Sequence, residues 1–332
     1  MVWYCVRRKP SEPTFTRLSA MKWTKKDILD IDSLSREEIT LILDTASGLK
    51  EISERSIKKV PTLRGKTIVL FFVEPSTRTR VSFDIAAKRL SADSISIAAS
   101  TSSLTKGETL IDTARNIEAM RPDILVMRHS AAGAPHLLAK HLSTCIVNAG
   151  DGMHAHPTQA LLDLMSVREI KKDLSGLKVA IVGDIAHSRV ARSNIAGFSR
   201  MGASVTISGP PTMMPAGIDT FGASVAKNVD DAIADADVIM MLRIQKERQQ
   251  NFLMPSEREY ASQYGLNRTR LKKIRPDALI MHPGPINRGV EIAPEAADGP
   301  NSIILEQVTN GVAVRMSVFY LLAGGVRNAD SD

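Results

Sequence analysis

The sequence predicts an α/β protein built from two doubly wound parallel-sheet domains. Short, continuous apolar runs alternate with stretches of helical periodicity along most of the chain. Continuous apolar runs of this kind are typical of strands buried on both faces, as in a parallel sheet covered by helices. The alternation forms two series that meet near residues 150–175, and 332 residues are enough for two domains, each with its own core.

The first series begins with a helix in the segment SLSREEITLILDTASGLKEI, where Ser35 and Glu38 have the spacing of a capping box. Strands are expected next at TIVLFF, SISIA, DILVM and CIVNA, which are short and rich in branched apolar residues. Helices are expected after these strands, at about residues 77–90, 108–119, 134–141 and 158–170.

The second series follows the polar segment KKDLSG. Its expected strands are KVAIVGD, SVTIS, DVIMML and ALIMH, with helices at 188–201, near 230–234 and before the last strand. The segment GVAVRMSVFYLLAGG is expected to be a helix that ends at its glycines. We assign residues 21–160 to a first domain, onto which a C-terminal helix at 308–327 packs back, and residues 161–307 to a second. Residues 1–20 are expected to be a disordered N-terminal extension.

The composition limits the class of protein. A hydrophobic content of 43% and a charged content of 24% are those of a soluble globular protein. No apolar run reaches the roughly 18 residues that a membrane span needs. A net charge of +7 suits small anionic substrates, and aromatic residues for stacking on nucleic-acid bases are few. The two cysteines, Cys5 and Cys145, lie far apart, so we expect no disulfide framework and a cytoplasmic location. No nucleic-acid or membrane partner is expected.

In doubly wound sheets, ligands bind outside the carboxyl ends of the strands, where strands turn into helices. The first such turn is EPSTRTRVSF, residues 74–83. A helix that begins near Thr77 exposes unpaired backbone N–H groups, while Ser76, Thr79 and the planar guanidinium of Arg78 add further donors. These donors together predict an anion site at a helix N-terminus. The simpler alternative is that Ser76 is an ordinary helix cap and the arginines are solvated.

The turn NAGDGMHAHPTQ contains the pattern H-x-H at His154 and His156, with Asp151 nearby, which raises the possibility of a metal site. A zinc site would need three or more ligands. Pro157 at the start of the next helix instead favours His156 as a hydrogen-bond donor held at the turn, with Gln159 one turn into the helix. We expect neither a metal nor a cofactor.

The remaining turns add cations and fixed carbonyls. Arg128, Arg189 and Arg243 follow strands, and Gln245 follows the last of these arginines. Each is a weak signal by itself, since a solvated arginine is common at such a position. The glycines of a dinucleotide-binding turn are absent from KVAIVGDIAHSR. Such a set is typical of electrostatic positioning of two small anions rather than of covalent chemistry.

Seven segments occur together in the order and spacing of a known family: STRTR, SSLTKGE, RH, HPTQ, VGDIAHSR, RIQKER and HPGPINRGVEI. Over about residues 21–327 the chain resembles the catalytic chains of aspartate carbamoyltransferases, in the aspartate/ornithine carbamoyltransferase family. The resemblance implies transfer of the carbamoyl group of carbamoyl phosphate to L-aspartate, in pyrimidine biosynthesis. It also implies a homotrimer with shared active sites. Family members differ in pairing with regulatory or dihydroorotase-like chains, and the sequence leaves this open.

The resemblance also implies roles for individual residues. The residues implied to bind carbamoyl phosphate are Ser76, Thr77, Arg78, Thr79, Ser102, Lys106, Arg128, His156, Gln159, Gly284 and Pro285, and those implied to bind aspartate are Lys106, Arg189, Arg243 and Gln245. Of these, Arg78, Thr79, Lys106, Arg128 and His156 are implied to be catalytic. Ser102 and Lys106 would reach into a neighbouring subunit's site, and Glu74 would orient Arg189 and Arg248 when the domains close. Gly284 stands where some relatives have larger apolar residues, which puts the rigidity of the HPGP turn in doubt.

Two alternatives are weighed against this interpretation. An ornithine carbamoyltransferase would share STRTR and HPTQ, but its amino-acid site carries a cysteine in an HCLP turn, whereas this chain has HPGP and no cysteine after Cys145. An inactive homologue that acts as a scaffold is disfavoured by the complete set of matched polar residues.

Overall fold

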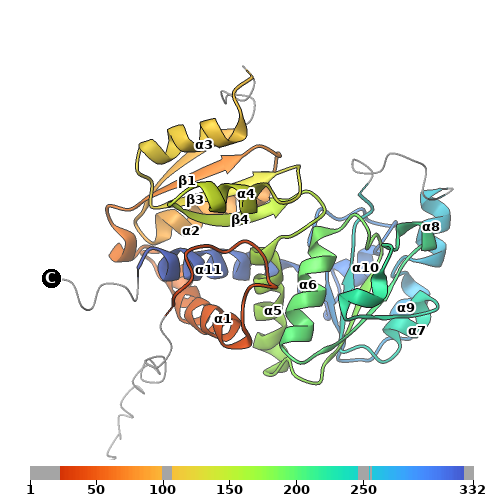
Figure 1. The fold of residues 1–332 in the computed structure, drawn as a ribbon. Coiled ribbons are helices and arrows are strands. Elements are labelled where there is room, and N and C mark those ends of the chain that lie inside the picture. The colour runs from red at the N-terminus through yellow and green to blue at the C-terminus, as the bar shows by residue number, and fades with distance from the viewer. Residues whose placement is uncertain (1–22, 99–106, 246–253, 255, 325–332) are drawn as a thin grey trace, which may run out of the picture.

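Two parallel β-sheets form the framework of the protein, as the computed structural model shows (Figure 1). The structure describes residues 23–98, 107–245, 254 and 256–324. The first sheet has the order β2-β1-β3-β4, with β1 at Thr67–Phe72, β2 at Asp93–Ala98, β3 at Ile124–His129 and β4 at Cys145–Asp151. The second has the order β7-β6-β5-β8-β9, with β5 at Lys178–Val182, β6 at Ser204–Ser208, β7 at Ser224–Val225, β8 at Val238–Met241 and β9 at Leu279–Met281.

Helices connect and cover both sheets. The first half contains α1 (Arg36–Lys50), α2 (Thr77–Arg89), α3 (Leu110–Ala119), α4 (Ala134–His141) and α5 (Pro157–Lys171). The second contains α6 (Arg189–Arg200), α7 (Val229–Ile233), α8 (Glu257–Gln263), α9 (Arg268–Leu271), α10 (Pro294–Ala297) and α11 (Ile304–Leu322). The predicted capping box at Ser35 and Glu38 is present at the start of α1. The predicted α/β class with two parallel sheets is confirmed.

Helices α5 and α11 join the two halves. In Figure 1 α11 runs beneath the first sheet, and it contacts α5, α1 and α2, so the predicted return of the C-terminal helix to the first half is confirmed. One continuous apolar core runs through this junction, since it includes Leu70 of β1, Ile181 of β5 and Val314 of α11. The helix begins earlier than predicted, at Ile304, and ends at Leu322 rather than 327. The division at residues 160 and 161 stays a prediction.

One strand differs from the expected burial. SISIA is predicted to be buried on both faces, but β2 lies at the edge of its sheet and has an exposed or half-buried residue at every position. Ile95 is 53% exposed. The apolar run therefore predicted the strand correctly but its burial wrongly. Burial depends on which elements pack against the strand, and the run itself does not show this. The described helices include none with both the length and the apolar content of a membrane span.

Candidate active site

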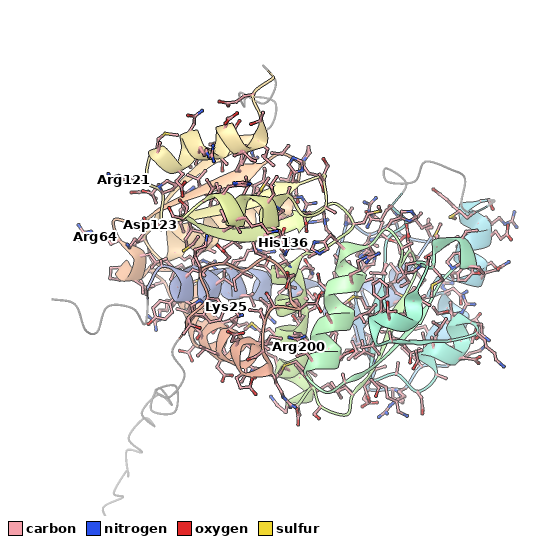
Figure 2. The ribbon with its side chains drawn as sticks, viewed as in Figure 1. Lys25, Arg64, Arg121, Asp123, His136 and Arg200 are labelled. Atoms are coloured by element: carbon pink, nitrogen blue, oxygen red, sulfur yellow. The ribbon has the colours of Figure 1, made fainter. Side chains whose placement is uncertain are left out.

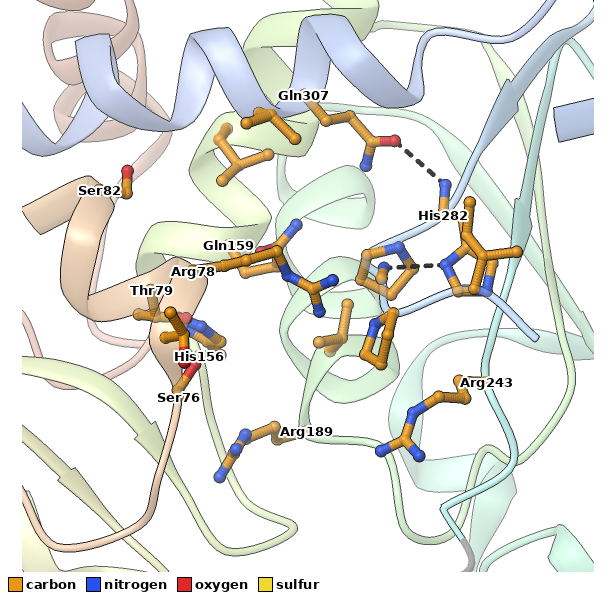
Figure 3. Close-up of a pocket in the computed structure, with 18 of the residues that line it drawn as sticks. Ser76, Arg78, Thr79, Ser82, His156, Gln159, Arg189, Arg243, His282 and Gln307 are labelled. Carbon is orange, nitrogen blue, oxygen red and sulfur yellow. Dashed lines mark hydrogen bonds between the residues drawn. The ribbon is translucent and has the colours of Figure 1, made fainter. Parts of the chain in front are cut away.

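The turns at the carboxyl ends of strands from both sheets line one cavity of about 740 Å³ (Figure 3). The sequence-predicted residues that line it are Glu74, Ser76, Thr77, Arg78, Thr79, Arg128, His156, Gln159, Arg189, Arg243, Gln245, Gly284 and Pro285. The remaining predicted residues, Ser102, Lys106 and Arg248, lie outside the described part of the chain. Parallel topology accounts for the convergence, since it gathers the carboxyl ends of neighbouring strands at one edge of each sheet.

The N-terminus of α2 opens onto this cavity. Ser76 is the N-cap residue, but its side chain makes no capping hydrogen bond, and the first turn contains no acidic residue. In contrast, Ser35 and Ser188 cap α1 and α6 by accepting backbone N–H groups. The alternative that Ser76 is an ordinary helix cap is therefore not supported. Uncapped N–H groups and the partial positive charge of a helix N-terminus favour a bound anion.

Glu74 joins two arginines that face the cavity from different halves of the molecule. Its Oε1 accepts hydrogen bonds from Arg128 Nη2 at 2.6 Å and from Arg189 Nη2 at 2.5 Å. Its Oε2 accepts a third, from Arg189 Nη1 at 3.0 Å. Both arginines are buried, so the carboxylate supplies the neutralising charge that buried cations need. The predicted contact of Glu74 with Arg189 is present, and its contact with Arg128 is an addition that the sequence did not indicate.

The end of β4 and the turn that follows it support the same two arginines through the backbone. The carbonyl oxygens of Ala149 and Gly152 accept hydrogen bonds from Arg128 and Arg189, each at 3.1 Å. A Cβ atom at Gly150 would lie 3.0 Å from Arg189 Nε and 3.1 Å from Arg128 Nη1. The glycine thus allows the backbone to approach both guanidinium groups closely.

The two histidines of the H-x-H pattern separate. His156 is 4% exposed, occupies the N-cap position of α5 without a side-chain capping bond, and lines the cavity. Its backbone N–H donates to Ser193 Oγ of α6 at 2.9 Å, which fixes the start of α5. His154 instead contacts Asp151 at 2.9 Å and is not among the residues that line the cavity. The H-x-H pattern therefore does not form one metal-binding pair.

Gln159 is oriented by a buried carboxylate. Its Nε2 donates to Asp163 Oδ1 at 3.0 Å, which leaves its Oε1 as the acceptor for a ligand. Asp163 also accepts from Gln307 Nε2 of α11 at 2.7 Å and from Asn194 Nδ2 of α6 at 2.8 Å. Burial raises the pKa of Asp163 to about 7, although the three amide donors oppose this increase. One carboxylate thus joins α5, α6 and α11 directly beneath the cavity.

This raised pKa predicts a pH-dependent contribution to stability. Between about pH 4 and about pH 7 the folded state retains the proton of Asp163 while the unfolded state has lost it, so raising the pH favours unfolding. We expect the free energy of unfolding, measured relative to Asp163→Asn, to fall by roughly 2 kcal/mol from about pH 5 to about pH 7. Denaturant titrations of both proteins across this range check the prediction. Parallel pH profiles would contradict it.

The HPGP turn after β9 is held by side chains on both sides. His282 Nδ1 accepts the Gly284 N–H at 2.8 Å, so its Nε2 carries the proton and donates to Glu291 at 3.1 Å. Gln307 accepts the backbone N–H of His282 at 3.0 Å (Figure 3). Gly284 has a φ of +64°, and a Cβ there would lie 3.1 Å from the guanidinium of Arg78. These contacts hold the turn from both sides, and the close approach of Arg78 is compatible with a glycine at position 284.

The cavity is strongly cationic. Figure 3 shows Arg78, Arg189 and Arg243 around the same space, from α2, α6 and the segment after β8. Burial and the like charge of Arg243 lower the pKa of Arg78. Arg243 Nη2 donates to Gln245 Oε1 at 3.3 Å, and the Gln245 backbone N–H donates to Asp184 at 3.3 Å. Anionic ligands would relieve the repulsion between these arginines. The site therefore favours anions.

The sequence interpretation missed several lining residues, notably Ser82, Ser188, Gln307 and Arg315. Arg315 is buried on α11, donates to Ser82 Oγ at 2.9 Å and lies 4.8 Å from the centre of the Phe83 ring. Burial lowers its pKa to about 10. The available signal was a single arginine within the apolar segment GVAVRMSVFYLLAGG, where a charge must find a buried partner.

Comparisons with known proteins identify the same family as the sequence motifs, along nearly the whole chain. Residues 26–169 match the family model described as aspartate/ornithine carbamoyltransferase, carbamoyl-P binding domain. Residues 175–322 match the aspartate/ornithine carbamoyltransferase, Asp/Orn binding domain. An aspartate carbamoyltransferase catalytic subunit from Desulforapulum autotrophicum is 68% identical over 94% of this chain and 100% of its own. One from Desulfosudis oleivorans is 66% identical over 93% of this chain and 99% of its own.

Solved structures agree with the fold. Ornithine carbamoyltransferase from Pyrococcus furiosus superposes with a TM-score of 0.82 at 30% identity, covering 92% of this chain and 100% of that one. Aspartate transcarbamoylase from Trypanosoma cruzi in complex with carbamoyl phosphate gives 0.81 at 26% identity, covering 92% and 98%. Matches of this extent and identity show that the chain belongs to the aspartate/ornithine carbamoyltransferase family.

Proposed function

We propose that this protein transfers the carbamoyl group of carbamoyl phosphate to the amine of L-aspartate, which gives N-carbamoyl-L-aspartate and phosphate in de novo pyrimidine biosynthesis. The observation that carries the proposal is the convergence of Arg78, Arg128, Arg189 and Arg243 on one cavity, from the carboxyl ends of four strands. The two substrates together bring a phosphate and two carboxylates, the anions that guanidinium groups bind in a bidentate manner. The high identity to aspartate carbamoyltransferase catalytic subunits supports aspartate as the acceptor.

The phosphate of carbamoyl phosphate binds at the N-terminus of α2. There the backbone N–H groups and hydroxyls of Ser76, Thr77 and Thr79 surround it, and Arg78 closes the site from the side of the HPGP turn. The absence of a side-chain cap on α2 supports this assignment, because a phosphate then supplies the missing acceptor.

The carbamoyl group lies over the start of α5. Thr79, Arg128 and His156 donate to its oxygen, on which negative charge develops as the carbonyl carbon becomes tetrahedral. The Oε1 of Gln159 and the carbonyl of Pro285 accept from its amide. The support for the role of Gln159 is the bond from its Nε2 to Asp163, which turns the acceptor end of the amide toward the cavity.

Aspartate binds between Arg189, Arg243 and Gln245, with its uncharged amine directed at the carbamoyl carbon. The amine nitrogen forms the new C–N bond, the C–O bond to phosphate breaks, and phosphate leaves with that electron pair. The amine proton passes to the departing phosphate. This sequence needs positioned cations but no covalent enzyme intermediate, which suits the residue types in the cavity.

We assign Glu74 to domain closure, since it follows β1 while its partner Arg189 begins α6. We also assign Arg248 to domain closure, as a second arginine that Glu74 would orient. Ser102 and Lys106 are assigned to a neighbouring subunit's site, in a homotrimer. The exposed apolar side chains of Val81 on α2 and Ile95 on β2, 46% and 53% exposed, support an additional subunit in this region. A cytoplasmic location stays a prediction, as does any association with regulatory or dihydroorotase-like chains.

The proposal is tested by a colorimetric assay of carbamoylated amino acid with the purified full chain. We expect N-carbamoyl-L-aspartate from carbamoyl phosphate and L-aspartate, and no citrulline when L-ornithine replaces aspartate. Citrulline as the main product would reassign the acceptor to ornithine. No product from either amine, in a folded protein, would instead favour an inactive homologue.

A further inference from the structure

A second group of polar side chains lies behind the turn that follows β4. His136 is on α4 (labelled in Figure 2), Asp151 ends β4, and His154 is in the turn. One potential ligand atom from each of these three residues lies within 4.8 Å of the other two. None of the three lines the cavity described above. Residues from separate elements are thus brought together outside the cavity that we assign to carbamoyl transfer.

Each histidine has a carboxylate partner. His136 Nε2 lies 2.7 Å from Asp30 Oδ2, and His154 Nδ1 lies 2.9 Å from Asp151 Oδ2. Asp30 Oδ1 also accepts the backbone N–H of Ser33 at 2.7 Å, so this carboxyl group is held in place behind His136. Because its partner is a carboxylate oxygen, His136 Nε2 is the donor of this pair. Histidines that bind metals typically have such a carboxylate behind them.

The contact with Asp30 uses Nε2, so Nδ1 is the ring nitrogen of His136 that remains for another partner. Nδ1 is buried, and within the described part of the chain it has no hydrogen-bond partner. Buried polar atoms are satisfied in most proteins, and an exception calls for an explanation such as an ion. A buried ring nitrogen without a partner, in a cluster with another imidazole and a carboxylate, is a candidate ligand for a cation.

Asp151 is held in place by hydrogen bonds. Its side chain is fully buried, and its oxygens accept the backbone N–H groups of Gly133 at 2.6 Å and Ala155 at 3.1 Å, as well as the Asn148 amide at 2.8 Å. The carboxylate is therefore held in place before any cation arrives. A metal would take the place of the proton that His154 Nδ1 shares with it.

We propose that His136, Asp151 and His154 form a binding site for a divalent transition-metal cation of the zinc type, with Asp30 as the outer partner of His136. Two imidazole nitrogens and one carboxylate oxygen are a typical three-ligand set for such ions, with water in the fourth position. The two rings have centroids 5.2 Å apart. With Zn–N bonds of about 2.0–2.1 Å, two imidazoles on one tetrahedral ion would have centroids on the order of 5 Å apart. The His154 side chain is 42% exposed, so solvent reaches the site.

A metal bound at this site would also support the backbone that contacts two arginines of the cavity. The end of β4 presents the carbonyl of Ala149 to Arg128, and the turn after it presents the carbonyl of Gly152 to Arg189. A cation bound by Asp151 and His154 braces this turn from its opposite side. The sequence interpretation weighed His154, His156 and Asp151 and expected no metal. The sequence does not show that α4 brings His136 to His154.

The test is direct binding of Co²⁺ and Zn²⁺ to the full chain after treatment with a chelator. Co²⁺ is followed by the visible absorption that a tetrahedral N/O site produces, and Zn²⁺ by competition against bound Co²⁺. We expect saturable binding by the unaltered protein and an increase in its Tm. His136→Asn and His154→Asn are each expected to weaken binding at least about tenfold, and Asp30→Asn is expected to weaken it by about tenfold through the outer partner.

His141→Asn is the matched control, because His141 is an exposed residue at the end of the same helix and lies outside the cluster. It should bind both ions as the unaltered protein does. Circular dichroism of each metal-free variant separates loss of binding from loss of fold. Absence of saturable binding in the unaltered protein, or equal affinity in the two histidine variants and the control, would overturn the proposal. Neither outcome bears on carbamoyl transfer, which is measured separately.

Discussion

Arg78→Ala is expected to lower kcat/KM for carbamoyl phosphate by at least about 10³-fold while leaving the fold intact. Positioned cationic donors to reacting phosphoryl and acyl groups have kinetic effects of this size. Arg78 lies at the uncapped start of α2, and its guanidinium lies against Gly284. Its loss removes the side-chain charge nearest to the proposed phosphate site. The measurement is steady-state kinetics with carbamoyl phosphate varied at saturating aspartate.

The fold should tolerate this substitution because burial and the like charge of Arg243 both disfavour the charged form of Arg78 and lower its pKa. Removing it relieves repulsion with Arg243, so the Tm should be unchanged or slightly higher. Arg268→Ala serves as the control. It removes an exposed guanidinium that pairs with Glu295 on the surface, and such solvent-screened pairs contribute little to stability. Near-normal turnover in Arg78→Ala would show that the phosphate binds elsewhere.

Arg243→Ala is expected to raise the KM for aspartate by about 100-fold, with a much smaller effect on the KM for carbamoyl phosphate. The reason is the separation of the two substrates between the two halves of the molecule. Arg243 follows β8 of the second sheet and contacts Gln245, whereas the proposed phosphate site is on α2 of the first half. Loss of one guanidinium leaves one substrate carboxylate without its charged partner.

The measurement is a pair of saturation curves, one for each substrate, for the variant and for Arg268→Ala. Succinate adds a second readout, since it carries both carboxylates but no amine and therefore competes with aspartate without reacting. Its inhibition constant should rise in parallel with the aspartate KM. Equal increases in the KM of both substrates would contradict an aspartate-specific role and would indicate a general loss of charge from the cavity.

Local pattern was sufficient to locate most of the elements. TIVLFF and SVTIS coincide with β1 and β6, and the helix predicted at 134–141 coincides with α4. Continuous apolar runs and cap residues carry this information within a few neighbouring positions. The burial of β2 was predicted wrongly, because its exposure depends on its place at the edge of the sheet. Its own residues do not carry that information.

The candidate site was predictable to the extent that topology follows from the alternation of strands and helices. Once the sheets are parallel, Ser76, Arg128, His156, Arg189 and Arg243 must lie at the carboxyl ends of strands, and the structure brings all of them to one cavity. Their chemical roles were taken from the resemblance to a family and not from the pattern. Cations at strand ends indicate anions, but they do not identify which anions.

The sequence by itself thus determined the α/β class, the two series of strands and the cationic turns at their ends, because each of these is encoded in a short segment. Only the tertiary structure decided which buried charges meet. Glu74 joins Arg128 to Arg189, Asp163 joins three helices, and α4 carries His136 to His154. Such pairs lie far apart along the chain, and the energy of a buried charge depends on the groups that folding places around it.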